Sequence, residues 1–412
     1  MPYAQTHAVF STAAQRPTGR SFLIDTFKAV GCLLIVLHHM AFYGPMSDVV
    51  ARAWPALVSW LYDHGRLAVQ LFLVCAGFLT AGSLARLESL ALAVALRLVV
   101  QRYLRLAIPL LAAFSFTVLV TEWVRPEFQH ASLSATPTWG QALAHLALLQ
   151  HVLNMESLSA GIWYVAIDFQ LYAMTLLSVV ALKFWPLARG TLSLHDLRRT
   201  LWLGLTCASW WWWNLHTGLD DHGLYFFGSY GLGLLAWEAR QSLHRARPQT
   251  DSQVPAHVQH GIIWVVFLAV GAVAWVLGPR LRMALAFAVA AVLMAAPAAS
   301  WTCETLHEVS GVRLGLAMLR RAVVWLSTVS YSVFLIHFGV SLAVSAGVTI
   351  LWPGVLWANS LGMLTSLTLS LFMGAVLHHG VERPAPTWGR WWLWAGIFIA
   401  SVAFAMQWSQ AF

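Results

Sequence analysis

Long apolar runs recur from Phe22 almost to the end of the chain, and short polar segments separate them. Each run has about 18 or more residues, which is enough to cross a hydrocarbon core of roughly 30 Å as a helix. We predict eleven spans, at residues 21–43, 66–85, 103–123, 161–183, 201–217, 222–239, 260–278, 282–299, 323–350, 355–379 and 391–409. Backbone groups in lipid must pair within their own segment, so the pattern predicts an all-α bundle of 10–11 transmembrane helices.

Three shorter patterns refine this picture. Residues 138–155 are apolar but contain His145, His151 and Asn154, so we expect an interfacial or re-entrant segment there. The glycines between residues 223 and 233 have the small-residue spacing that lets membrane helices pack closely. The tryptophans at 202 and 210–213 are interpreted as an interfacial aromatic belt.

Composition supports a membrane protein. Hydrophobic residues make up 59% of the 412 residues and charged residues only 10%, whereas a soluble domain is roughly 25% charged. The net charge of +8 does not indicate nucleic-acid binding, because the basic residues are scattered between apolar segments. If the N-terminus is cytoplasmic, 18 of the 24 Lys and Arg residues fall in inside segments. The positive-inside rule therefore predicts a cytoplasmic N-terminus.

The first predicted span carries an unusual polar stripe. Asp25, Lys28, Cys32, Ile35 and His39 follow a spacing of 3, 4, 3 and 4, which places them on one helical face. Lys28 and His39 lie about 16 Å apart along the axis. Ionisable groups at this depth indicate a functional site. The alternative is a local pair of Asp25 with Lys28 near the inner interface, with His39 inactive at the outer interface.

This stripe resembles the first helix of the acyltransferase family 3 membrane proteins, in which an Asp is followed by a basic residue, ten arbitrary residues and a His. Asp25, Lys28 and His39 match that spacing, with lysine where arginine is usual. Lysine keeps the charge but lacks the planar fork of arginine. Five further segments resemble family motifs in the same order: Val69–Phe78, Arg102-x-x-Arg105 with Pro109, Trp163–Tyr172, Ser330–His337 and Glu382-Arg383-Pro384.

The resemblance implies an integral membrane O-acyltransferase. Such a protein moves an acyl group, most often acetyl, from cytoplasmic acyl-CoA to a hydroxyl of a cell-surface glycan or lipid-linked sugar. We expect a multi-pass protein of the bacterial inner membrane that uses acetyl-CoA and binds no nucleic acid. The expected division is a cytoplasmic tail at 1–20, the acyltransferase domain at 21–385 and an additional helix at 386–412. The four cysteines show no CxxC or Cys/His ligand spacing, so we predict neither disulfides nor a metal site.

The resemblance also suggests catalytic roles. Acyl transfer from a thioester to a hydroxyl needs a base, and the near-neutral pKa of histidine suits that work. We therefore predict His39 as the base, assisted by Lys28 and Asp25; a covalent acyl-histidine route is the alternative. His38 lies about 100° around the helix and is the weaker candidate.

Binding roles follow from the other motifs. Arg102 and Arg105 lie three residues apart and are expected to bind the phosphates of coenzyme A, although positive-inside anchoring would also explain them. The predicted substrate-binding residues are Trp163, Asp168, Gln170, Tyr172 and His337. Asp168 could instead be structurally paired with Lys28 or Arg66, His337 could be a packed core histidine, and Glu382 with Arg383 is interpreted as a structural pair at a helix end.

Two other functions use the same residues. A secondary transporter could employ buried Asp, Lys and His as a proton relay, but the chain shows no internal repeat. Another class of membrane acyltransferase, such as the MBOAT type, would be built around a different essential histidine, for which His337 is the candidate. The sequence does not identify the acceptor or the oligomeric state.

Overall fold

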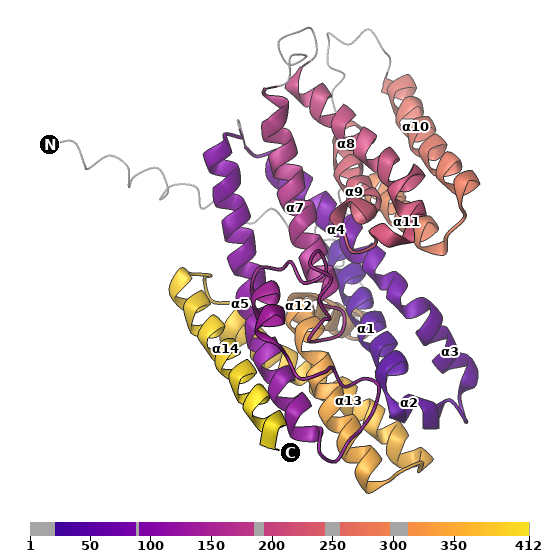
Figure 1. The fold of residues 1–412 in the computed structure, drawn as a ribbon. Helices are drawn as coiled ribbons and strands as arrows, with labels where there is room; N and C mark the ends of the chain where they lie inside the picture. The colour runs from indigo at the N-terminus through magenta and orange to yellow at the C-terminus, as the bar shows by residue number, and fades with distance from the viewer. Residues whose placement is uncertain (1–20, 88–89, 185–192, 244–255, 297–311, 412) are drawn as a thin grey trace, which may run out of the picture.

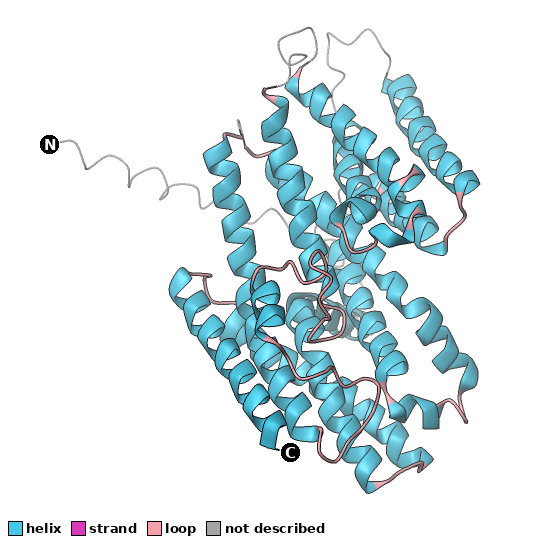
Figure 2. Ribbon diagram, in the orientation of Figure 1, coloured by secondary structure: helices cyan, strands magenta, loops and turns pink. Residues whose placement is uncertain are grey.

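The computed structural model describes residues 21–87, 90–184, 193–243, 256–296 and 312–411. The structure is 82% helical and contains no strand in these ranges (Figure 2). Its long helices are α1 (Phe22–Tyr43), α4 (Ala68–Leu84), α5 (Leu92–Val124), α7 (Trp163–Leu182), α8 (Leu194–Trp211), α9 (Gly223–Leu243), α10 (Ala256–Leu277), α11 (Leu281–Ala295), α12 (Val312–Leu351), α13 (Leu356–Leu377) and α14 (Trp388–Ala411). Shorter helices are α2 (Pro45–Val50), α3 (Pro55–His64) and α6 (Trp139–Leu146).

The predicted all-α membrane bundle is confirmed. Each of the eleven predicted spans corresponds to one long helix, and eight helices of the described residues are long and apolar enough to cross a membrane. One of these eight is a continuous unit of α3 and α4, at Pro55–Leu84. The helix α11 is apolar but shorter. The expected tail at residues 1–20 lies outside the described residues.

Several helix boundaries differ from the prediction because hydropathy does not register helical turns outside the apolar core. The helix α5 begins at Leu92 rather than 103, so Arg102 and Arg105 lie inside the helix and not at its entrance. The helix α8 begins at Leu194 rather than 201, where the Ser193 hydroxyl accepts a hydrogen bond from the Asp196 backbone N–H at 3.1 Å. Such a cap satisfies a backbone donor that the helix start would otherwise leave unpaired.

The central helices α1, α4, α5, α7 and α12 bring the family-like motifs together, while α13 and α14 pack along α12 and α5 (Figure 1). Glycines permit the close contact of α4 with α9. A Cβ atom on Gly77 would overlap the backbone oxygen of Tyr230, and one on Gly233 would overlap that of Val74. The small-residue prediction for this segment is therefore confirmed.

The aromatic-belt interpretation is wrong for two tryptophans. Trp202 and Trp210 are fully buried, and at Trp210 the facing helix α9 presents a glycine. A Cβ atom on Gly228 would lie 2.7 Å from the indole ring of Trp210. Trp212 is exposed, as expected of a belt residue. Large aromatic side chains at a helix end can therefore serve the core when the facing helix is small enough to receive them.

The apolar segment 138–155 does not form a spanning helix. Thr138 and Gln141 form a capping box that begins α6, an eight-residue helix followed by turns. His145 is buried in this segment: its Nδ1 donates to the Gln141 backbone oxygen at 2.7 Å, and its Nε2 accepts from the Leu158 backbone N–H at 3.2 Å. The histidines that break the apolar pattern thus fold the segment back on itself.

Candidate active site

A cavity of about 720 Å3 opens among α1, α4, α5, α7 and α12. Residues from all six family-like segments line it, although these segments are far apart in the sequence. The ionisable residues of the lining are Lys28, Cys75, Arg102, Arg105, Tyr164, Asp168, Tyr172, Tyr331 and Glu382. A wet, charged cavity inside the bundle is the environment in which ionisable residues of membrane helices are tolerated.

Arg102 and Asp168 form an ion pair across this cavity. The Arg102 Nη2 donates to Asp168 Oδ2 at 2.5 Å, and its guanidinium lies 5.5 Å from the ring centre of Tyr172. Asp168 is buried, whereas the Arg102 side chain remains 33% exposed. Asp168 is thus paired with Arg102, which is neither of the two partners considered for it, Lys28 and Arg66, because α5 passes beside α7 and places the guanidinium opposite the carboxylate.

The cavity has an excess of positive charge. Arg105 lies one turn along α5 from Arg102, is exposed, and lines the same cavity as Lys28. These three cations face two carboxylates, Asp168 and Glu382. Arginine side chains bind phosphate through paired, charge-assisted hydrogen bonds, so the cavity suits an anionic ligand.

Glu382 connects two helices at the edge of the cavity. Its Oε2 accepts from the Ser332 hydroxyl at 2.6 Å and from His378 Nδ1 at 2.9 Å. Within the described residues these are its bonding partners, and Arg383 is not among them. Glu382 thus has the structural role expected at a helix end, but with Ser332 and His378 as its partners in place of Arg383, and its bond to Ser332 ties the turn that follows α13 to α12.

Asp25 links α1 to α12, and Lys28 on the same helical face borders the cavity. Asp25 is buried and accepts a hydrogen bond from the Ser327 hydroxyl at 2.6 Å, which joins α1 to α12. Lys28, one turn further, lines the large cavity. Asp25 therefore fixes the helix that presents Lys28.

His39 forms a hydrogen-bonded pair with His337. The His39 Nδ1 lies 2.7 Å from His337 Nε2, and His337 Nδ1 lies 2.7 Å from the backbone oxygen of Phe334. Both imidazoles are buried. A carbonyl oxygen only accepts, so the network assigns the proton of His337 to Nδ1 and makes its Nε2 an acceptor. His39 must then donate from Nδ1, which leaves the lone pair of His39 Nε2 available.

The pair sits just beyond the inner end of the large cavity. The ring of Phe334 lines the cavity and lies 6.0 Å from the His337 ring, centre to centre. Gly161, at φ +76°, approaches both sides: a Cβ atom there would lie 2.7 Å from His39 Cε1 and 3.2 Å from the Phe334 ring. In the described residues neither His39 nor His337 lines the large cavity. Both instead line a separate pocket of about 20 Å3, with Tyr43, Ser132 and Ser341.

The remaining predicted residues have structural contacts. Gln170 Oε1 accepts from the Gly223 backbone N–H at 3.0 Å, at the start of α9. The Trp163 ring packs 5.3 Å from that of Phe226. Neither is part of the large cavity's lining in the described residues. His38 is not part of the pair of His39 with His337: its Nδ1 donates to the Leu61 backbone oxygen at 2.9 Å and so holds α3 against α1.

Sequence reasoning missed the aromatic end of the cavity. Phe72, Tyr164 and Phe334 line it, and the Tyr164 ring lies 5.8 Å from each of the other two. All three lie within matched motifs, but apolar rings in apolar helices give no signal of their own. In the described residues no group of three His, Cys, Asp or Glu side chains is arranged to hold a metal ion.

The fold and the cavity define a helical membrane protein with a charged internal site. The chain belongs to acyltransferase family 3, whose description is "Acyltransferase domain" and whose match covers residues 23–406, nearly the whole chain. It is therefore a multi-pass membrane acyltransferase, as the sequence motifs implied and in preference to the transporter alternative. Comparison with curated proteins and with solved structures finds no match.

Proposed function

We propose that this protein is an O-acyltransferase of the bacterial inner membrane. It transfers an acyl group, in the simplest case acetyl, from cytoplasmic acyl-CoA to a hydroxyl of a cell-surface glycan or lipid-linked sugar. The observation that supports this proposal best is the hydrogen-bonded chain from the Phe334 carbonyl through His337 to His39. That chain leaves a basic nitrogen free beside the inner end of a positively charged cavity.

His39 acts as the general base. Its Nε2 accepts the proton of the acceptor hydroxyl while the oxygen attacks the thioester carbonyl, and the bond to sulfur then breaks to release the coenzyme A thiolate. The thiolate recovers one proton, which His39 can return. His337 Nε2 accepts from His39 Nδ1 throughout and stabilises the imidazolium that forms. A third group that orients a catalytic histidine is a recurrent arrangement in acyl transfer.

The large cavity holds the donor. A cytoplasmic N-terminus places the beginnings of α1 and α5, which flank this cavity, toward the cytoplasm. Arg105 and Arg102 bind phosphates of coenzyme A, and Lys28 contributes further positive charge along the path. The long thiol arm points toward Phe334, and the acceptor approaches His39 from the opposite face of the membrane.

The test measures transfer of radiolabelled acetyl groups from acetyl-CoA to a pool of envelope glycans in proteoliposomes. At equal amounts of folded protein, His39→Ala is expected to lower kcat by roughly 10²- to 10⁴-fold, the usual contribution of a general base. The matched control is His38→Gln, which removes the neighbouring imidazole and keeps a donor for the Leu61 carbonyl. Wild-type activity in His39→Ala would refute the role of His39, and no labelled product from any acyl-CoA donor would refute the reaction.

A further inference from the structure

A second cavity, of about 300 Å3, lies between α8, α9 and α10. Its lining shares no residue with the candidate active site. Most of its wall is apolar and comes from Leu203, Leu232, Leu235, Ile262, Val266 and Val270. The structure thus contains a hydrophobic groove that is separate from the candidate active site.

Except for Thr206, the polar residues of this groove gather at one end. Arg199 lies in the second turn of α8, Glu238 and Ser242 near the end of α9, and Gln259 in the first turn of α10. Because these helices run antiparallel, the three helix ends meet at one face of the bundle. From Gln259 to Val270 the apolar part extends for about 16 Å along α10. The groove therefore has a polar end and a longer apolar part.

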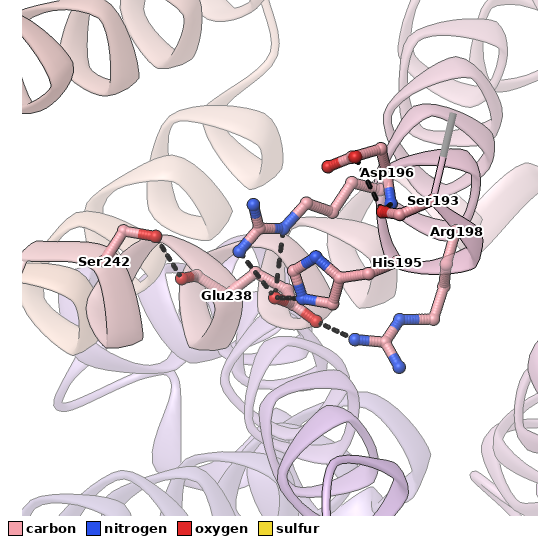
Figure 3. A network of polar contacts seen from close by, with 7 residues as sticks. Ser193, His195, Asp196, Arg198, Glu238 and Ser242 are labelled. Atoms are coloured by element: carbon pink, nitrogen blue, oxygen red, sulfur yellow. Dashed lines mark hydrogen bonds and ion pairs between the residues drawn. The ribbon is translucent and has the colours of Figure 1, made fainter. Parts of the chain in front are cut away.

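At the polar end, two arginines and His195 surround the buried Glu238 carboxylate (Figure 3). The buried Glu238 carboxylate accepts from Arg198 Nη2 at 2.5 Å and from Arg199 Nη2 at 3.0 Å, and His195 Nε2 lies 3.1 Å from it. The exposed Asp196 carboxylate accepts from the Ser193 hydroxyl at 2.6 Å and does not line the groove. Two guanidinium groups thus share one carboxylate. The Arg199 side chain is 32% exposed and borders the groove, so it can bind a second anion.

The groove opens toward lipid rather than toward the protein core. The helix α10 is apolar and long enough to span a membrane, yet it is mostly exposed along its length and stands at the edge of the bundle (Figure 1). Val266 borders the groove and is 40% exposed, and the adjacent Val265 faces away from it at 66% exposed. An open apolar groove within a bilayer is accessible to acyl chains.

We propose that this groove binds one anionic phospholipid, with its phosphate at Arg199 and one acyl chain along α10. Basic pockets between transmembrane helices bind anionic head groups, and arginine forms paired hydrogen bonds with phosphate oxygens. Because two guanidinium groups share the one carboxylate that lines the groove, we expect a net negative head group to bind better than a zwitterionic one. The apolar part of the groove holds one acyl chain of this lipid.

The test uses the full-length protein in nanodiscs of phosphatidylcholine that contain a minor fraction of phosphatidylglycerol. After extraction, native mass spectrometry counts the lipids that stay bound to each protein. The wild type is expected to retain one phosphatidylglycerol in preference to phosphatidylcholine. Val266→Trp, which fills the groove, should abolish this retention. Arg199→Gln should weaken it about fivefold, the effect of one basic residue near an anionic lipid, while Arg198 and His195 still pair with Glu238.

Two matched controls separate the groove from general effects. Val265→Trp places the same side chain on the lipid-facing side of α10, and Arg97→Gln removes an exposed basic charge elsewhere; both should retain the lipid like the wild type. Equal retention of the two lipids by the wild type would overturn the proposal. Equal retention by Val266→Trp and Val265→Trp would overturn it as well.

Discussion

Removal of the His337 imidazole is expected to lower the rate of acyl transfer without weakening the binding of acyl-CoA. His337 is fully buried, and its Nε2 accepts a hydrogen bond from His39 Nδ1 at 2.7 Å. In His337→Ala, the buried Nδ1–H of His39 loses its acceptor, which costs about 1–3 kcal/mol. The cost is largest in the transition state, where His39 becomes positively charged. Expressed as a rate, it is roughly a 5- to 150-fold loss of kcat.

A glutamine at the same position provides the decisive comparison. The side-chain oxygen in His337→Gln can occupy the place of the imidazole Nε2 and accept from His39 Nδ1, so this variant should recover most of the lost kcat. In the described residues His337 does not line the large cavity, so the KM for acyl-CoA should stay unchanged in both variants. The assay is acyl transfer in proteoliposomes, with kcat and KM measured separately at matched amounts of folded protein.

The proposed role of His337 as the hydrogen-bond acceptor of His39 requires that the two variants differ in kcat. Equal losses in His337→Ala and His337→Gln would show that His337 supports packing alone, because both remove the ring but only one removes the acceptor. A kcat of wild-type magnitude in His337→Ala would show that His39 is oriented by other means. A raised KM in either variant would contradict the separation of His337 from the donor cavity.

Two further predictions concern charge. Arg105→Gln should raise the KM for acyl-CoA about tenfold with little change in kcat, because it removes one charge-assisted phosphate contact; an equal effect of the exposed control Arg97→Gln would contradict a specific contact. Burial lowers the pKa of His145, outside the spanning helices, to about 4, so the neutral ring stabilises the fold above pH 6.5 and this stability is lost as the pH falls toward 4. Hydrogen exchange of residues 139–158 should show roughly 3 kcal/mol less protection near pH 4 than at pH 7 in the wild type. The control is His145→Gln, which keeps an acceptor for the Leu158 N–H. An equal loss of protection in this variant between pH 7 and pH 4 would refute the role of the imidazole ring.

The sequence predicts best what depends on neighbouring residues. The polar stripe on α1 follows from helical spacing alone, and the structure confirms that Lys28 faces a cavity. The glycines that let α9 approach α4 were likewise recognisable from their spacing. Local periodicity determines which face of a helix a residue occupies, so such statements need no knowledge of the tertiary fold.

Partners that lie far apart in the sequence could not be assigned in this way. Arg102 and Asp168 are separated by 66 residues, and His39 and His337 by 298. Each residue was recognisable as unusual, because ionisable groups are costly in a membrane helix. The choice among possible partners depends on which helices pack together, and that information is absent from hydropathy. The same limitation explains why the sequence pattern places Trp210 at an interface rather than in the core.

The position of Phe334 relates the two parts of the candidate site. Its ring lines the inner end of the large cavity, while its backbone oxygen anchors His337. Under the proposed function the thioester must reach His39, so this ring has to move aside. A rotation of the side chain can do so without disturbing the carbonyl, because the two groups are joined only through the Cα atom. The base therefore keeps its orientation while the path opens. A donor-bound structure in which the α12 backbone shifts and the bond between His337 and Phe334 breaks would contradict this account.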